Sequence, residues 1–402
     1  MNRLNNLEGG KMVREIKKDI FVVGAIDWDR RLFDELIPLP DGTSYNAYVI
    51  KGKEKNVLID AVDPTKEEEL ITNLKFLNLN IDYIVSLHSE QDHSGGIPKV
   101  LEIFPQAKVI TNKKGKEFLK DLLLIPEEKF IIVEDNEKIS LGDKTLQFIF
   151  TPWVHWPETM IAYLLEEKIL FTCDLFGSHL ATSDLFMKEE AKTYFAAKRY
   201  YAEIMMPFRN QIKNHLEKIK NLEIKMIAPS HGPIYSQPEF IIKAYEDWVS
   251  DKVKNEVVLV YVSMHGSTKV MAQFLLEELI KTNIKVIPFN LTKTDIGELA
   301  MAIVDAATVI LGTPTVLTGV HPQALYAVYL LNILRPKTKF IGIFGSFGWG
   351  GKTLEIIKNL ITNLNAELLP PVLIKGYPKE RDFQLLKELV EKIVTKHREL
   401  NL

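Results

Sequence analysis

From residue 256 to its end, the chain alternates short apolar segments with amphipathic ones, and this alternation constrains the fold more than any other feature. Each apolar segment has the length and branched residues of a buried strand, and helical spacing follows it. The predicted strands are 256–262, 284–290, 307–313, 339–345 and 371–377, and a last helix is predicted at about 380–398. Buried strands separated by helices predict a doubly wound parallel sheet, so this part is α/β.

The part before residue 255 follows a different pattern, in which strands alternate with turns and only some helices. Predicted strands are 19–27, 44–52, 55–63, 81–87, 107–112, 168–177 and 224–235, with a hairpin through Gly142 and Asp143. Predicted helices are 65–79, with Thr65 as its N-cap, 113–123, a long helical region from about 187 to 221, and 238–254. We therefore expect two domains, 1–252 and 253–402.

The composition excludes several classes of protein. With 402 residues, 46% of them hydrophobic, and a net charge of −3, the chain has the profile of a globular protein and not of a nucleic-acid binder. No apolar run is long enough to span a membrane, and the N-terminus lacks the apolar core of a signal peptide, so we expect a cytoplasmic location. The single cysteine, Cys173, excludes a disulfide framework and any all-cysteine metal site.

Seven side chains suited to metal binding follow predicted strands of the first domain or lie near their ends. His88, Glu90, Asp92 and His93 lie within six positions, and His155, Asp174 and His231 come later. Burying so many ionisable groups together is costly unless they coordinate or pair. Because two divalent cations would be neutralised by three carboxylates and one hydroxide, this set predicts a two-metal site.

Three other histidines are not expected to bind metal. His179 lies near the predicted site, and we expect it to support the ligands rather than to bind metal. His215 and His397 lie in lysine-rich helices, and we expect both to be solvated.

Three loops of the second domain follow the carboxyl ends of predicted strands, where ligands bind in doubly wound sheets. The first, "SMHGST" (263–268), opens a helix and offers hydroxyls and backbone N–H groups to a phosphate. It is neither a Walker motif nor a dinucleotide fingerprint. The loops "LGTPTVLTG" (311–319) and "FGSFGWGG" (344–351) let the backbone approach a flat ring, and Trp349 could stack near it.

These motifs together carry a family resemblance from about residue 13 to 398. "HSEQDHSG", "HWPETM", "TCDLFG" and "PSHGPIY" resemble the metallo-β-lactamase fold in its flavodiiron branch, with Glu90 where hydrolytic members usually have a histidine. The three loops of the second domain resemble flavodoxins. The resemblance implies a metallo-β-lactamase-like αββα sandwich followed by a flavodoxin-like sheet. It also implies two iron ions and FMN as cofactors.

The resemblance assigns residues to these cofactors. The first iron would be held by His88, Glu90 and His155, the second by Asp92, His93 and His231, and Asp174 would bridge them. Residues expected to contact FMN are Ser263, Met264, His265, Gly266, Ser267, Thr268, Pro314, Thr315, Val316, Leu317, Ser346, Phe347, Gly348, Trp349 and Gly350. Tyr200 and Tyr201 are expected to be wall or core residues, although a proton-donating tyrosine near the irons stays open.

The activity implied by the resemblance is reduction of dioxygen to water or of nitric oxide to nitrous oxide, with FMN relaying electrons to the irons. The donor would be a separate rubredoxin-like protein or a reduced deazaflavin, because a single cysteine excludes a fused rubredoxin. A head-to-tail homodimer, or a dimer of dimers, is also implied. Two alternatives stay open: a zinc-dependent hydrolase with an accessory flavodoxin domain, and an electron carrier or gas sensor with an inactive site.

Overall fold

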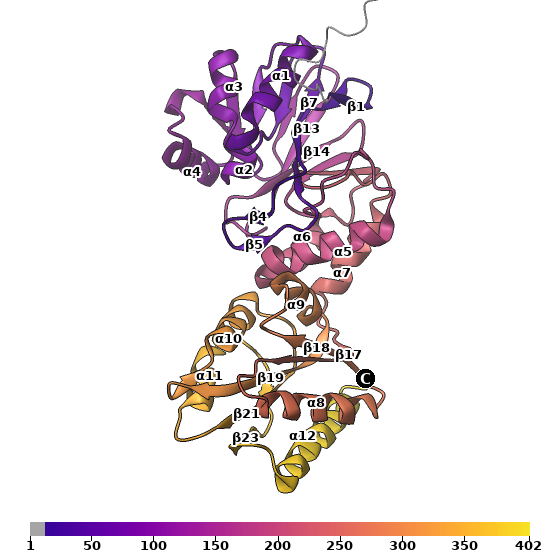
Figure 1. Cartoon of the computed structure of the whole chain (residues 1–402). Coiled ribbons are helices and arrows are strands. Elements are labelled where there is room, and N and C mark those ends of the chain that lie inside the picture. The colour runs from indigo at the N-terminus through magenta and orange to yellow at the C-terminus, as the bar shows by residue number, and fades with distance from the viewer. Residues whose placement is uncertain (1–12) are drawn as a thin grey trace, which may run out of the picture. The chain divides into compact units, whose positions relative to one another are not determined.

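The computed structural model of the chain describes residues 13–402. The N-terminal segment, in which we predict no signal peptide, lies mostly outside the described residues. The chain forms two compact units (Figure 1). The first runs to Tyr201 and resumes over Phe208–Val249, and the second takes Ala202–Pro207 and Ser250–Leu402. Within the described residues, no helix is both long and apolar enough to cross a bilayer.

Two sheets form the centre of the first unit. The seven-stranded sheet has the order β1-β2-β7-β8-β9-β10-β11, and the five-stranded sheet has the order β12-β13-β14-β15-β16. The strands of the larger sheet are β1 (Arg14–Lys17), β2 (Ile20–Val22), β7 (Tyr48–Lys51), β8 (Asn56–Ile59), β9 (Tyr83–Val85), β10 (Lys108–Thr111) and β11 (Phe130–Ile132). Those of the smaller sheet are β12 (Lys138–Ser140), β13 (Thr145–Phe150), β14 (Met160–Leu164), β15 (Ile169–Cys173) and β16 (Met226–Pro229).

Helices and two short hairpins complete the first unit. The helices are α1 (Glu67–Leu77), α2 (Gln91–Ser94), α3 (Ile97–Ile103), α4 (Lys113–Leu123), α5 (Glu190–Tyr200), α6 (Arg209–Ile219) and α7 (Glu239–Val249). The short hairpins pair β3 (Ala25–Asp27) with β6 (Thr43–Tyr45), and β4 (Leu32–Phe33) with β5 (Ile37–Pro38). This arrangement agrees with the expected αββα sandwich.

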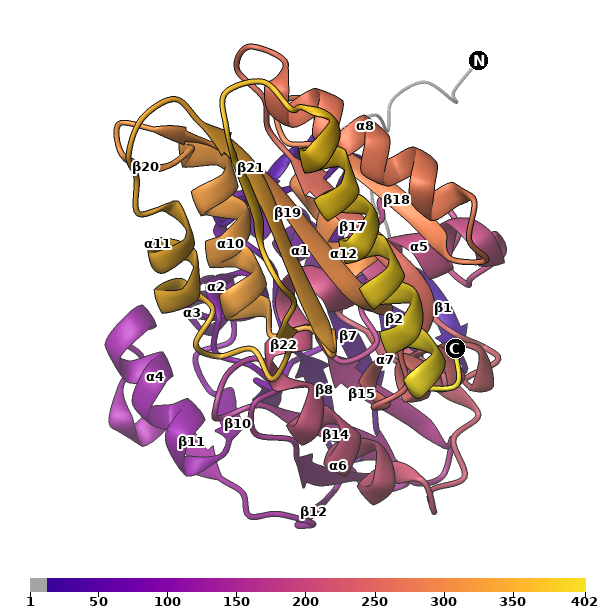
Figure 2. The ribbon, with the colours of Figure 1, turned by 90° about the horizontal axis from the view of Figure 1, so that it is seen from below.

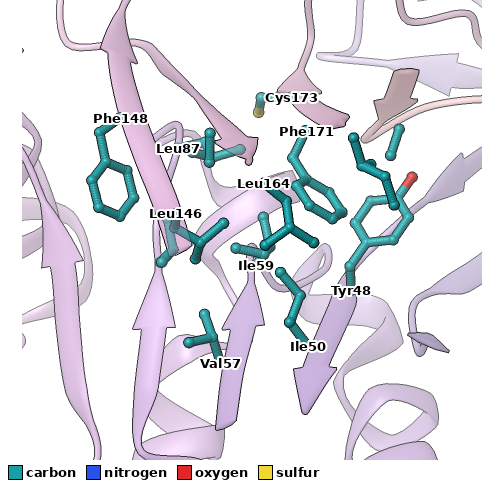
Figure 3. Close-up of a cluster of buried hydrophobic side chains, with 14 of the residues drawn as sticks. Tyr48, Ile50, Val57, Ile59, Leu87, Leu146, Phe148, Leu164, Phe171 and Cys173 are labelled. Carbon is teal, nitrogen blue, oxygen red and sulfur yellow. The ribbon is translucent and has the colours of Figure 1, made fainter. Parts of the chain in front are cut away.

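Alternating side chains of the larger sheet supply two separate cores. On β7, Tyr48 and Ile50 face the smaller sheet, whereas Val49 belongs to the core formed with α1, α3 and α4. Figure 3 shows the core between the sheets, where Ile59 of β8 and Leu87, which follows β9, meet side chains of the smaller sheet such as Phe148, Leu164 and Phe171. Both faces of the larger sheet are therefore buried, which fixes its register.

Several predicted elements differ in detail from those observed. The predicted strand 19–27 is divided into β2 and β3 at Gly24, where a Cβ atom would lie 2.0 Å from the carbonyl oxygen of Tyr45. Thr65 is not the N-cap: it lies inside a 3₁₀ turn (Pro64–Lys66) that Asp63 caps by accepting from the Thr65 N–H at 2.8 Å. The helical region 187–221 is interrupted by a π-turn at Tyr201–Met205 and a 3₁₀ turn at Met206–Phe208.

The second unit is a parallel sheet with the order β18-β17-β19-β21, beyond which both β22 and β23 pair with β21. Its strands are β17 (Lys254–Tyr261), β18 (Lys285–Asn290), β19 (Ala306–Val316), β20 (Gly319–Val320), β21 (Phe340–Phe347), β22 (Glu367–Leu368) and β23 (Val372–Lys375). Its helices are α8 (Ser267–Ile280), α9 (Ile296–Ile303), α10 (Pro322–Leu334), α11 (Thr353–Leu360) and α12 (Glu380–Glu399). In Figure 1, α9 and α10 lie above this sheet and α8 and α12 below it, and Figure 2 shows α12 lying along the direction of the strands. The doubly wound topology is therefore as expected.

Candidate metal centre and cofactor loops

The seven predicted metal ligands lie beyond the carboxyl ends of strands in the first unit. His88 follows β9, Asp174 follows β15 and His231 follows β16, and the last two strands are parallel neighbours. Glu90 occupies the N-cap position of α2, so Asp92 and His93 lie in the first helical turn. Their side chains therefore leave the backbone in a different direction from those of His88 and Glu90. The loop between β13 and β14 supplies His155. The fold thus brings together residues that are far apart in the sequence.

One group of ligand atoms surrounds a single point. The Nε2 atom of His88 lies 3.1 Å from Glu90 Oε2 and 3.5 Å from Asp174 Oδ2. The Nε2 atom of His155 lies 3.1 Å from each of the same two oxygens. Metal–ligand bonds of about 2.1 Å would place neighbouring ligand atoms about 3.0–3.4 Å apart, so these separations suit one metal ion.

A second group surrounds a second point and shares the other oxygen of Asp174. The Nε2 atom of His93 lies 3.0 Å from Asp174 Oδ1 and 3.2 Å from Asp92 Oδ2. The Nε2 atom of His231 lies 3.2 Å from Asp92 Oδ2 and 3.5 Å from Asp174 Oδ1. Each oxygen of the Asp174 carboxylate therefore faces its own set of nitrogen and oxygen ligands.

The electrostatics of this cluster favour cations. Among the described residues, both carboxylate oxygens of Asp92 are buried without a well-aligned hydrogen bond, although the Nε2 atoms of His93 and His231 lie 3.2 Å from Oδ2. This burial is costly unless a cation satisfies the oxygens. Burial alone would lower the pKa of His231, but the nearby carboxylates of Asp174 and Asp92 raise it to about 10. For His155, burial is likewise outweighed by bonds to Asp174 and Glu90, and its pKa rises to about 9. Divalent cations fit this donor set and would replace the protons that these histidines otherwise bind.

Two residues beside the centre contact its proposed ligands. The sequence did not point to one of them, Glu158, and left the role of the other, Tyr200, open. Glu158, which we did not single out, has an oxygen 2.7 Å from Nδ1 of His88, although it lies in the same "HWPETM" motif as His155. Tyr200 donates its hydroxyl to Asp174 Oδ1 at 2.7 Å, so it is more than a wall residue. His179 packs against His231, with ring centroids 4.9 Å apart, and its Nδ1 lies 2.9 Å from Thr43 Oγ1.

The prediction that His215 and His397 are solvated was wrong, because both are buried. The Nε2 atom of His215 lies 2.8 Å from the carbonyl oxygen of Pro152. The Nε2 atom of His397 lies 2.8 Å from Thr308 Oγ1, and its Nδ1 lies 2.7 Å from Asn255 Oδ1. Both rings are therefore held by partners inside the protein.

The three predicted cofactor loops of the second unit follow β17, β19 and β21, which are parallel, so they share one edge of the sheet. In the first loop, Gly266 has φ +96° and directly precedes α8, where a residue with a Cβ atom would be strained. In the second, Leu317 and Thr318 both have positive φ and form the tight turn between β19 and β20. The predicted loop 311–319 is therefore mostly strand and hairpin.

A cavity of about 550 Å³ opens beside two of these loops and has the size of a small-molecule site. Thr315, Phe347 and Gly350, all predicted FMN contacts, line it together with residues that begin α11. The residues of the first loop, 263–268, do not line this cavity. The hydroxyl of Thr268 is buried and has no hydrogen-bond partner within residues 13–402, which fits a phosphate acceptor at this helix N-terminus.

Known proteins resemble this chain over both units. A family model described as "ODP family beta lactamase" matches residues 43–232. The chain is 36% identical to a nitric oxide reductase of Moorella thermoacetica, covering 95% of this chain and 98% of that protein. It is 32% identical to the coenzyme F420H(2) oxidase of Methanothermobacter marburgensis, covering 87% and 89%.

Solved structures agree with these relatives. The rubredoxin oxygen:oxidoreductase of Desulfovibrio gigas superposes with a TM-score of 0.93 at 30% identity, covering 96% of this chain and 99% of that chain. The flavodiiron protein of Giardia intestinalis superposes with a TM-score of 0.87 at 26% identity, covering 95% and 97%. The similarity therefore extends over both units.

Proposed function

The chain belongs to the flavodiiron proteins, and from this premise we propose that it reduces dioxygen to water, nitric oxide to nitrous oxide, or both, at two iron ions. The observation that carries the proposal is the Asp174 carboxylate, whose two oxygens each face a separate set of ligands. One set is His88, Glu90 and His155, and the other is Asp92, His93 and His231. This arrangement suits a bridged pair of metals and is more than one hydrolytic zinc ion needs.

The donor set favours iron over zinc. Nitrogen and carboxylate oxygen atoms of the described residues point at the two positions, and Glu90 raises the share of oxygen. Such donors suit iron, which changes oxidation state, whereas zinc does not. Reduction of dioxygen to two waters takes four electrons and four protons, and reduction of two nitric oxides to nitrous oxide and water takes two of each. Iron and FMN would supply these electrons, since both exchange them singly.

The chain's own residues hold and orient the cofactors in this proposal. Asp174 fixes the spacing of the two metal positions, and Tyr200 fixes one oxygen of Asp174 by its hydrogen bond. The residues Ser263–Thr268 hold the FMN phosphate at the N-terminus of α8, and the hairpin between β19 and β20 and the loop after β21 hold its ring. The exposed indole of Trp349 lies in this last loop.

The names of two relatives indicate the kind of electron donor. One is named as an oxidase of a reduced deazaflavin coenzyme and another as an oxidoreductase of rubredoxin, and we propose a donor of one of these two kinds. We also propose a head-to-tail homodimer, or a dimer of dimers, in which the FMN of one chain serves the irons of the other, and a cytoplasmic location. Mixing an FMN-free variant with an iron-free variant tests the assembly, because only a head-to-tail dimer would restore activity.

The experiment that tests the function is metal and flavin analysis of protein produced with ample iron, followed by anaerobic gas-consumption assays. We expect about two irons and one FMN per chain, and consumption of dioxygen or nitric oxide when the FMN is reduced. The Asp174→Ala variant should keep FMN but lose iron and gas consumption, while Asp184→Ala, a surface control, should resemble the wild type. Zinc in place of iron would contradict the proposal and favour the hydrolase. A diiron protein that consumes neither gas would favour a sensor or carrier.

A further inference from the structure

The histidines of the metal centre differ in what holds their far nitrogen. The Nδ1 atom of His88 lies 2.7 Å from Glu158 Oε1, and that of His231 lies 2.7 Å from the carbonyl oxygen of Ser44. The Nδ1 atom of His93 instead lies 3.5 Å from the sulfur of Cys173. A carboxylate is a strong acceptor and a thiol a weak one. His88 is therefore the most firmly held of these three ligands, and His93 the least.

Glu158 is itself held in place. The residue is buried, with an exposed fraction of 2%. The same oxygen that faces His88 accepts the backbone N–H of Ser89 at 2.9 Å. The Asn112 side chain donates to the Glu158 carbonyl oxygen, which ties the loop after His155 to the start of α4. Glu158 therefore fixes both the ring of His88 and the backbone that follows it.

We propose that Glu158 is a positioning residue for His88, and that it makes the metal position of His88, Glu90 and His155 the tighter of the two. The metal at the position of Asp92, His93 and His231 should leave first when the protein is exposed to a chelator. This inference rests on the proposed function only in requiring that the centre holds two metal ions.

The physical reason is the charge of the Glu158 acceptor. A carboxylate on the far nitrogen fixes the tautomer of a histidine, orients its ring and makes the coordinating nitrogen a better donor. Loss of such a partner typically weakens metal binding by about 10–100-fold. The thiol of Cys173 cannot provide this effect for His93, because its hydrogen bond is weak and it carries no charge when protonated. The two metal positions should therefore differ in affinity although both contain two histidines.

The test measures release of iron from the intact protein, loaded anaerobically with Fe(II), to an excess of a ferrous chelator. The wild type should lose its irons in two phases of about one iron each, with the second phase about tenfold slower or more. The Glu158→Gln variant keeps the shape of the side chain but not its charge, and should speed the slow phase by about 10–100-fold. Glu128→Gln, which removes an exposed carboxylate of the same unit, should behave as the wild type.

Two further variants assign the phases and guard against misfolding. Asp92→Asn weakens the metal position of Asp92, His93 and His231, and should leave the slowly released iron in place. The double variant Asp92→Asn/Glu158→Gln should release that remaining iron faster. Glu158→Asp keeps the charge but shortens the side chain, and it should give an intermediate rate of release. It replaces Glu158→Gln as the test if that variant folds poorly. In metal-free protein, the Nδ1–H signal of His88 in ¹⁵N-histidine spectra should shift in Glu158→Gln and not in Glu128→Gln.

The outcomes separate this inference from the proposed function. Equal release rates in wild type and in both Glu158 variants, with an unchanged His88 signal, would overturn the role of Glu158. Release of the Glu158-dependent iron in the first phase would overturn the proposed order. Fewer than two metals bound by the wild type would instead count against the two-metal centre itself.

Discussion

The hydroxyl of Tyr200 donates a hydrogen bond to Asp174 Oδ1 over 2.7 Å. This is the same oxygen that faces His93 and His231, so the tyrosine contacts the carboxylate on the side of the second metal position. Tyr200 is buried at the last turn of α5. Burial and the charge of Asp174 raise its pKa well above 10, so the phenol remains a proton donor throughout the pH range of normal assays.

Tyr200→Phe should therefore disturb the centre without disturbing the fold. A hydrogen bond to a charged group contributes about 1.5–3 kcal/mol, so metal-free protein should lose stability by about this amount or less. We expect two irons to remain bound but gas consumption to fall by about tenfold, because Asp174 loses the donor that fixes its orientation. Urea unfolding, iron analysis and steady-state rates measure these three quantities.

Tyr201→Phe is the matched control for this prediction. Tyr201 is equally buried, but its hydroxyl donates to the carbonyl oxygen of Trp248 at 3.2 Å, away from the metal ligands. This variant should lose some stability and no activity per bound iron. Equal activity of the two variants would show that Tyr200 has no role beyond packing.

Iron loading of the metal-free protein should release protons. Hydrogen bonds to the carboxylates outweigh burial and raise the pKa of His155 to about 9 and of His231 to about 10, so both are protonated at pH 7 without metal. Metal can bind only the neutral imidazole, so each histidine must give up its proton. Adding Fe(II) anaerobically at pH 7 in weak buffer with an indicator should release about two protons per chain or more. The release should be smaller in Asp174→Ala, and no release from the wild type would contradict these assignments.

The same charges predict how the stability of metal-free protein depends on pH. A histidine whose pKa is raised by folding stabilises the protein fully below its unfolded pKa of about 6.5. This stabilisation is lost as the pH rises through the folded values of His155 and His231, about 9 and 10. The melting temperature of the metal-free protein should therefore fall between pH 7 and 10, and bound metal should reduce this fall.

The clustering of the proposed metal ligands was predictable because they are dense in the sequence and lie at or near the ends of strands. The buried histidines were misjudged from their lysine neighbours. In α12, the buried residues Leu386, Val390, Ile393 and His397 follow helical spacing, so His397 continues the apolar stripe. In α6, His215 lies between Ile212 and Ile219 in the same way. Position on the stripe was a better guide to burial than the charge of adjacent residues.

Glu158 was not predictable in this way. Its partner His88 is 70 residues away, and a single carboxylate in a loop carries no local signal. Only the packing of the two sheets brings the loop after β13 beside the end of β9. Supporting residues of this kind are set by tertiary structure, whereas the ligands themselves lie in short motifs.

His397 should make the stability of the second unit depend on pH. Burial lowers its pKa to about 4, since the charged ring would lose its hydration. A histidine whose pKa is lowered by folding stabilises the protein fully above its unfolded pKa of about 6.5, and this is lost as the pH falls towards 4. The urea midpoint of the second unit should therefore fall between pH 7 and 5, and less so in His397→Gln. An NMR titration in which His397 protonates near pH 6.5 would contradict this reading.

Thr268→Val should weaken FMN binding without weakening the fold. The Thr268 hydroxyl is buried at the start of α8 and has no hydrogen-bond partner in the second unit, so the methyl group of valine costs the protein itself nothing. If this hydroxyl donates to the FMN phosphate, its loss removes a bond to a charged group, worth about 1.5–3 kcal/mol, or roughly a tenfold to hundredfold rise in Kd. Titration of FMN into flavin-free protein, followed by flavin fluorescence, measures the change.

Thr151→Val, which removes another buried and unpartnered hydroxyl but in the first unit, is the control and should leave the Kd unchanged. Thr268→Ser should retain most of the affinity, because it keeps the hydroxyl. Equal Kd values for the wild type and Thr268→Val would remove this residue from the phosphate site and leave the backbone N–H groups after Gly266 as the donors to test next.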